Sequence, residues 1–87
     1  MSVKIYNLSF IKDLPKEIEV DICDVSLAEM IDYLESEYKS EIKKSLIVNG
    51  KVGERSRVLV NGLSVTNPDT QIPDGSRLVF STILSGG

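Results

Sequence analysis

The chain has 87 residues, 41% of them hydrophobic and 26% charged, with a formal net charge of −3. This length supports one domain with a single hydrophobic core. The ten basic residues are scattered among thirteen acidic ones, which argues against nucleic acid as a partner, because neutralising phosphates requires clustered lysine and arginine.

The residue types present exclude most catalytic and metal-binding chemistry. Histidine is absent from the sequence, which removes the most common general base, most Ser-His and Cys-His nucleophile pairs and the usual zinc sites. The acidic residues match no calcium-loop spacing, and the glycines match no phosphate-binding loop, so we expect no bound metal or cofactor. The only cysteine, Cys23, has acidic neighbours at Asp21 and Asp24, which disfavour a thiolate, and we interpret it as structural.

The sequence also predicts where the protein works. A single cysteine cannot form an internal disulfide, which is typical of a reducing compartment. No apolar run has the length of a signal peptide or a membrane span. We therefore expect a cytoplasmic protein without a membrane partner.

The first elements predicted along the chain are two strands and a helix. Residues 3–10 and 17–22 alternate between apolar and polar side chains, as strands do. Ser26 and Glu29 then form a capping-box pattern, which marks a helix start. We expect the helix to end between residues 40 and 44, close to Lys39, Lys43 and Lys44, since cations stabilise the C-terminal end of a helix. Its apolar stripe at helical spacing contains Leu27, Met30, Ile31, Leu34, Tyr38 and Ile42.

The second half of the chain is predicted to contain short strands joined by tight turns. Asn49-Gly50 and Asn61-Gly62 each follow an apolar run. Such a pair is a strong hairpin signal, because both residues tolerate the positive φ of a type I′ turn. Residues 51–56 are predicted to form a loop, residues 66–74 to contain turns with little regular structure, and residues 77–80 to form the last strand.

This order of elements predicts an α+β fold, in which one main helix packs across a small mixed sheet. In such a layout the first and last strands can lie parallel in the centre of the sheet. We divide the chain into a folded domain, residues 1–80, and a flexible C-terminal tail, residues 81–87.

The tail ends in Gly86-Gly87. Its seven residues, extended at ~3.3 Å each, reach about 23 Å, which is enough to enter another protein's active site. Glycines have no Cβ, so both can pass through a channel too narrow for a side chain. We therefore interpret the Gly87 carboxylate as the reactive group, and a free carboxylate needs activation, for example as an acyl adenylate. The alternative is a frayed terminus without a role.

Apolar residues near the tail are candidate partner contacts. Ile83 and Leu84 would anchor the tail in a groove of the partner, while Ser85 goes deeper. Leu59 and Val79, expected on the outward face of the sheet, would continue that surface. The alternative is that these are scattered apolar groups of an ordinary surface.

The whole pattern resembles the MoaD/ThiS family of ubiquitin-like sulfur carriers and, within it, the small subunits of molybdopterin synthase. The resemblance covers nearly the whole chain and depends on the order and spacing of several segments. They are Val3–Ile5, Phe10–Leu14, Ser26–Met30, Arg57–Gly62 and Ile72–Phe80, together with the terminal Gly86-Gly87. Carriers of the thiamine pathway are typically shorter, which favours the molybdopterin branch.

The resemblance implies a β-grasp (ubiquitin-like) fold and a role in molybdenum cofactor biosynthesis. An adenylylating activating enzyme would use ATP to adenylate Gly87, and a sulfur donor protein would convert the adenylate to a thiocarboxylate. The large subunit of molybdopterin synthase would then receive the sulfur. The chain itself would be a non-catalytic carrier, and its acidic balance would help it meet a basic activating enzyme.

Three other hypotheses remain open. A ubiquitin-like protein modifier, joined through Gly87 to lysines of other proteins, would pass through the same adenylate. A sulfur carrier of the thiamine pathway would share the thiocarboxylate. A passive interaction domain would have a tail without any function.

Overall fold

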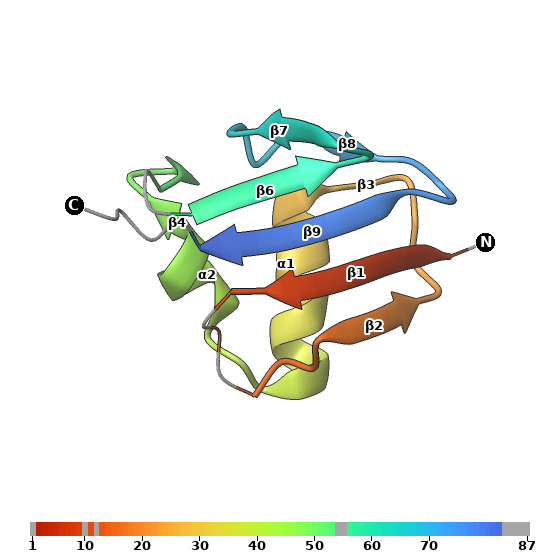
Figure 1. Ribbon diagram of the computed structural model, residues 1–87, viewed down its shortest axis with the longest axis horizontal. Coiled ribbons are helices and arrows are strands. Elements are labelled where there is room, and N and C mark those ends of the chain that lie inside the picture. The colour runs from red at the N-terminus through yellow and green to blue at the C-terminus, as the bar shows by residue number, and fades with distance from the viewer. Residues whose placement is uncertain (1, 10, 12, 54–55, 83–87) are drawn as a thin grey trace.

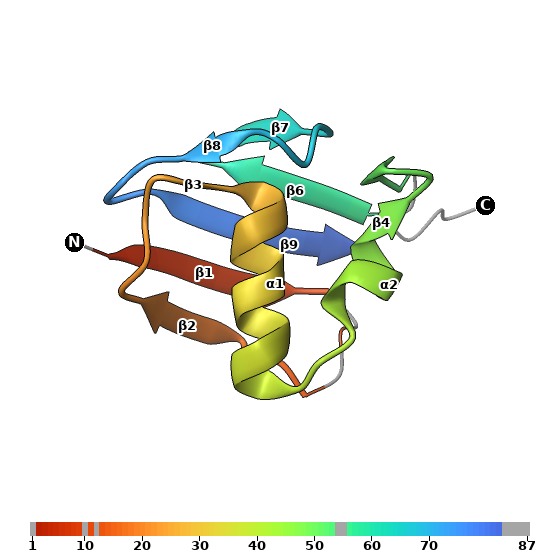
Figure 2. The same cartoon turned by 180° about the vertical axis from the view of Figure 1, so that it is seen from behind.

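The computed structural model describes residues 2–9, 11, 13–53 and 56–82. Within them, five strands form one mixed sheet in the order β2-β1-β9-β6-β7. These strands are β1 (Val3–Leu8), β2 (Glu17–Val20), β6 (Ser56–Val60), β7 (Leu63–Val65) and β9 (Arg77–Thr82). Helix α1 (Leu27–Tyr38) crosses one face of this sheet (Figure 1, Figure 2). The predicted α+β architecture is confirmed.

The first and last strands lie side by side and parallel in the centre of the sheet, as the sequence predicts. Residues 4–8 of β1 are in register with residues 77–81 of β9. On its other side, β9 pairs antiparallel with β6. The C-terminal residues therefore follow a strand that is hydrogen-bonded along both edges.

The core lies between α1 and the inner face of the sheet. Alternate residues of the central strands point into it, and Val3, Ile5, Val58, Leu78 and Phe80 have no exposed surface. The helix contributes Leu27, Met30, Ile31 and Leu34, which are equally buried and confirm the predicted apolar stripe. Each large apolar side chain buried in this way contributes roughly 1.5–3 kcal/mol to folding.

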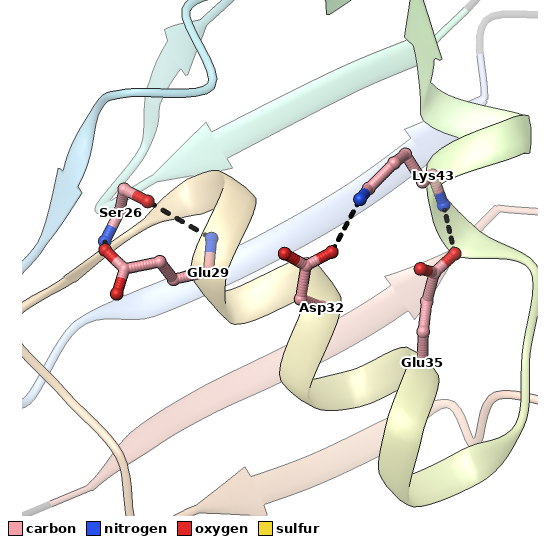
Figure 3. Close-up of polar contacts among 5 residues, drawn as sticks. All are labelled: Ser26, Glu29, Asp32, Glu35 and Lys43. Atoms are coloured by element: carbon pink, nitrogen blue, oxygen red, sulfur yellow. Dashed lines mark hydrogen bonds and ion pairs between the residues drawn. The ribbon is translucent and has the colours of Figure 1, made fainter.

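The predicted capping box at the start of α1 is present (Figure 3). The Ser26 hydroxyl accepts the Glu29 N–H at 3.1 Å, and the Glu29 carboxylate accepts the Ser26 N–H at 3.1 Å. Two backbone donors that a helix start leaves free are thereby satisfied.

The helix ends earlier than predicted, and a second helix follows. α1 stops at Tyr38, and Lys39 adopts a left-handed conformation with a φ of 52°. The chain then turns into α2 (Ile42–Leu46), which runs in a different direction (Figure 2). A continuous helix would carry the chain past the edge of the sheet, whereas this break keeps Ile42 and Leu46 buried. The apolar stripe continues through the break, so the periodicity alone did not reveal it.

Lys43 connects α2 to α1 through two contacts (Figure 3). The Glu35 carboxylate accepts the Lys43 N–H at 2.8 Å, which satisfies a donor in the first turn of α2, where no N-cap side chain bonds. The Lys43 ammonium lies 2.6 Å from Asp32 Oδ1, and this hydrogen bond raises the pKa of Lys43. The prediction that placed Lys43 near the end of the first helix is wrong, because the residue belongs to α2.

Both predicted Asn-Gly hairpins are confirmed. Asn49-Gly50 joins β4 (Ile47–Val48) to β5 (Lys51–Val52), and Asn61-Gly62 joins β6 to β7, with positive φ at all four turn residues. The predicted loop at residues 51–56 is wrong at both ends, since β5 begins at Lys51 and β6 at Ser56. The first turn folds Lys51 back onto Val48, so a polar residue enters a strand.

Other differences concern short strands. β1 ends at Leu8, where the Asn7 side chain accepts the Ser9 N–H at 3.1 Å and turns the chain. β8 (Gln71–Ile72) pairs with β3 (Val25–Ser26) inside the region predicted to have little regular structure. Strands of two residues have no periodicity of their own, and only their pairing in the folded chain creates them.

Candidate partner-binding face and C-terminal exit

The predicted reactive terminus follows strand β9. This strand continues to Thr82, two residues beyond its predicted end at Phe80, because Ser81 and Thr82 pair with β6. Both residues had been assigned to the tail, and they belong to the sheet. The remaining tail residues, Ile83, Leu84, Ser85, Gly86 and Gly87, lie outside the described residues, so the roles predicted for them stay predictions.

The sheet face opposite α1 carries both surface residues predicted to contact a partner. Leu59 of β6 and Val79 of β9 are direct cross-strand neighbours. Tyr6 of β1 lies on the other side of Val79, and all three side chains are partly exposed. We call these three residues the outer apolar row. The structure therefore brings Leu59 and Val79 together and adds Tyr6, which alternation along β1 placed on the outward face but which had not been assigned to the surface.

Charged side chains flank the outer apolar row: Arg77 and Lys4 are basic, and Glu17, in register with Tyr6, is acidic. The Arg77 guanidinium lies over the Tyr6 ring, 5.7 Å from its centroid, a contact typically worth about 0.5–1 kcal/mol at exposed sites. Lys4 is in register with Arg77 on the neighbouring strand. The Asn61 side chain accepts the Arg77 N–H at 2.9 Å and so connects the β6–β7 turn to the start of β9. An open depression beside Val79 is lined by Asn61, Gly62, Gly75 and Arg77.

The side chains on this face are suited to binding a partner and not to catalysis. Tyr6, Val79 and Leu59 form a contiguous apolar surface, and they include no carboxylate, thiol or amine. Such a row can bury apolar area against a partner, and the flanking Lys4 and Arg77 can pair with acidic groups around it. Among the described residues, no three histidine, cysteine or acidic side chains are grouped so that they could hold a metal ion.

Cys23 lies in the loop between β2 and β3 and is partly exposed. Its Sγ lies 3.5 Å from Asp24 Oδ2. Partial burial, followed by the hydrogen bond and the negative charge of Asp24, raises the pKa of the Cys23 thiol. These surroundings support the interpretation of Cys23 as a structural residue, since a protonated thiol is a poor nucleophile.

The raised pKa makes a testable prediction about thiol reactivity. At pH 8 we expect iodoacetamide to alkylate Cys23 more slowly than an unstructured cysteine peptide, because less of the thiol is ionised. The rate should approach that of the peptide as the pH rises through the pKa of the folded protein. Asp24→Asn should increase the rate at pH 8, because it removes the neighbouring negative charge. Alkylation of the native protein as fast as the peptide would contradict the assignment.

The topology and the outward row together define a ubiquitin-like β-grasp protein. One chain of the BexX/CysO complex of Amycolatopsis orientalis superposes with a TM-score of 0.80 at 23% identity, over 98% of this chain and 99% of that one. SAMP1 of Haloferax volcanii, small archaeal modifier protein 1, superposes with a TM-score of 0.75 at 18% identity, over 100% of both chains. Urm1 of Trypanosoma brucei gives a TM-score of 0.70 at 18% identity, over 99% of this chain and 95% of that one.

The model of the ThiS family matches residues 7–87. The chain therefore belongs to the ThiS family, within the MoaD/ThiS superfamily of ubiquitin-like sulfur carriers. No curated protein sequence matches the chain. The β-grasp fold expected from the sequence and the resemblance to this superfamily are both confirmed.

In the part of the chain that the structure describes, neither helix has the length and apolar composition needed to cross a membrane.

Proposed function

We propose that the chain is a sulfur carrier that acts as the small subunit of molybdopterin synthase and carries sulfur as a thiocarboxylate on Gly87. Membership of the ThiS family supports a carrier role. The proposal depends on the position of β9 in the centre of the sheet and on the sequence that follows this strand. This strand is held along both edges, and the sequence that follows it ends in Gly86-Gly87.

The chemistry begins at the terminal carboxylate. In the active site of the activating enzyme, a carboxylate oxygen of Gly87 attacks the α-phosphate of ATP, and pyrophosphate leaves. The terminal sulfur of a persulfide on a sulfur donor protein then attacks the acyl adenylate and displaces AMP. A second thiol cleaves the resulting acyl disulfide, which forms a disulfide on the donor and leaves a thiocarboxylate on Gly87. In the large subunit of molybdopterin synthase, the thiocarboxylate sulfur displaces a leaving group from the acceptor substrate and forms a thioester. Water then hydrolyses this thioester, so the sulfur stays on the acceptor and the terminal carboxylate is restored.

The chain contributes positioning to these steps. Binding through a folded surface converts the encounter of the terminal group with a partner's active site into an effectively intramolecular event. The outer apolar row supplies such a surface, on the same strand that leads to the terminus. No acid or base from the chain itself is needed, so the protein acts as a carrier and binds no cofactor of its own.

The proposed partners are the activating enzyme, the sulfur donor and the large subunit, all in the cytoplasm, with neither nucleic acid nor membrane involved. A chain of this fold occurs in a complex with a second protein in the BexX/CysO structure, which supports docking of this chain on a protein partner.

The direct test of the function is the intact mass of the chain. After incubation with its activating enzyme, ATP and a sulfur donor, mass spectrometry should show one terminal oxygen replaced by sulfur. Transfer of that sulfur to a pterin precursor by the purified large subunit would assign the molybdopterin branch, and transfer only to a thiazole precursor would assign the thiamine branch. An unchanged mass with active partner proteins would refute the carrier role.

A substitution on the outer apolar row should weaken partner binding without unfolding the protein. We expect Leu59→Ala with Val79→Ala to raise the Kd for the activating enzyme about tenfold or more, because each side chain contributes apolar contact near the centre of the interface. The matched control is Leu63→Ala, since Leu63 is 72% exposed on β7 and lies outside the row. Isothermal titration calorimetry measures the affinities. Equal affinities for the double variant and the control would show that the outer apolar row does not contact the activating enzyme.

A second candidate function is protein modification through Gly87. The full-length superposition with SAMP1, a protein named as a modifier, favours it. The distinguishing observation is a covalent product. If an isopeptide bond between Gly87 and lysines of other proteins is found by mass spectrometry of cell extracts, the modifier role is supported, and both roles can share the adenylate.

A further inference from the structure

The charged residues on five strands of this protein are all basic, although the net charge of the chain is −3. Strands β4, β5, β6, β7 and β9 contain no acidic residue, and their charged residues are Lys51, Arg57 and Arg77. The acidic residues of the described chain lie on β2, on α1 and in the connecting segments. Arg77 lies at the start of β9, whereas Arg57, opposite Ser81, and Lys51, on the neighbouring hairpin, are the basic residues nearer its end.

Neighbouring strands place two exposed side chains beside the end of β9. Across the sheet, Ser81 lies between Leu8 of β1 and Arg57 of β6. Arg57 is exposed, and 66% of Leu8 is exposed. At this position, therefore, an apolar side chain and a cation lie on opposite sides of the strand that leads to the terminus.

The β4–β5 hairpin completes the arrangement. Thr82 is in register with Ser56, whose N–H bonds to Gly53 O at 3.1 Å. Gly53 lies directly beneath Val48, since a Cβ added there would lie 2.9 Å from Val48 Cγ2. Val48 is 55% exposed and pairs with the exposed Lys51. Figure 1 shows this hairpin and α2 beside the end of β9, and Figure 2 shows the same from behind.

We infer that Leu8, Val48, Lys51 and Arg57, which we call the exit rim, form a second contact surface, and that it docks on an acidic surface around the channel of the activating enzyme. This inference rests on the proposed function, because it requires that the terminus enters that enzyme. The exit rim differs from the outer apolar row in its residues and in its charge.

The terminal segment is short, so a partner that binds the Gly87 carboxylate must also lie close to the exit rim. Five residues follow Thr82, and at ~3.3 Å each they span at most about 17 Å. An enzyme that holds the Gly87 carboxylate must therefore place its surface close to the end of β9. Exposed cations at that position require acidic or neutral groups opposite them, because like charges in contact cost several kcal/mol.

Among residues 2–9, 11, 13–53 and 56–82, the acids at this end of the sheet lie away from Lys51 and Arg57. Asp13 and Glu17 lie in and after the β1–β2 connection, on the side of β1 away from β6. Glu41 lies at the start of α2, where its carboxylate is 3.8 Å from the Lys44 ammonium. The cations on the β6 side are consequently available to a partner. The sequence predicts that the acidic balance of the chain favours a basic enzyme, and the present inference assigns an acidic surface to that enzyme only where it meets the exit rim.

The test compares association rates of the full chain with its purified activating enzyme. We expect Lys51→Gln with Arg57→Gln to lower the association rate constant about tenfold at low ionic strength. At about 1 M salt, where the screening length is about 3 Å, the two rates should be nearly equal. Lys39→Glu is the matched control, because it gives the same net charge but changes the exposed residue after α1. We expect it to stay within about twofold of wild type.

Several outcomes would overturn the inference. If both variants are slowed equally, only the total charge matters and the exit rim is not a contact. If the rim variant associates as fast as wild type or faster, the enzyme presents no acidic surface there. Thermal unfolding of each variant excludes loss of the fold as a cause. If wild-type protein is adenylated normally and the rim variant shows no defect, only this inference is refuted. If wild-type protein is never adenylated, the proposed function is refuted together with this inference.

Discussion

A chain lacking Gly87 folds normally and receives no sulfur; this is the largest functional effect we expect. Deletion moves the terminal carboxylate back by one residue, about 3.3–3.6 Å. A misplacement of about 1 Å at a reacting centre can cost a factor of about one hundred in rate, so a shift of this size should abolish adenylation. Intact mass spectrometry after incubation with the activating enzyme, ATP and sulfur donor measures the result.

The matched control for this deletion is Ser36→Ala, at an exposed position of α1, which keeps both the length of the chain and the terminal glycines. It should still acquire sulfur, because it removes only one hydroxyl far from the tail. Circular dichroism and thermal unfolding should be nearly unchanged in both variants, since β9 ends at Thr82, before Gly87, and Ser36 is exposed. Normal sulfur loading of the deleted chain would show that Gly87 is not the reactive residue.

The largest effect on stability is expected from Phe80→Ala. Phe80 has no exposed surface and lies on β9, between β1 and β6, facing the core under α1. Removal of a buried phenylalanine ring costs about 3–5 kcal/mol, out of a total of about 5–15 kcal/mol for a typical domain. Denaturation by urea should therefore show a greatly lowered midpoint or a protein that is already partly unfolded in buffer.

The adjacent residue provides the control for Phe80. Val79 lies on the same strand but points to the outward face and is partly exposed. Val79→Ala should cost less than about 1 kcal/mol, although it lies in the outer apolar row proposed to bind a partner. Comparable losses of stability from the two substitutions would mean that the faces of β9 are not divided in this way.

Signals that act over a few residues were sufficient to predict several parts of the structure. Ser26 and Glu29 cap the helix because their side chains reach backbone donors only three residues away. Asn61-Gly62 turns the chain because both residues tolerate positive φ. The same applies to Leu59 and Val79, which alternation along each strand places on the outward face.

The surfaces proposed to bind a partner depend on contacts between distant segments. Tyr6 joins Val79 and Leu59 only because β1 pairs with β9 in one register. Likewise, Val48 and Lys51 reach the end of β9 only because the β4–β5 hairpin packs beside β6. A spacing of tens of residues in the sequence contains no signal for such neighbours.

By itself, the sequence determined the fold class, the start of α1, both Asn-Gly turns, the parallel central strands and the family. The start of α1 and the turns depend on local backbone preference, and the fold class depends on the order of elements and the period of their apolar residues. The parallel strands were expected from that layout, and the family from its resemblance to known carriers. The tertiary structure alone decided where α1 breaks, how β3 pairs with β8, that β9 extends to Thr82, and that Leu8 and Arg57 lie on either side of Ser81. The reason is physical: these features arise from burial and pairing between segments far apart in the chain, and their energies exist only after the chain has folded.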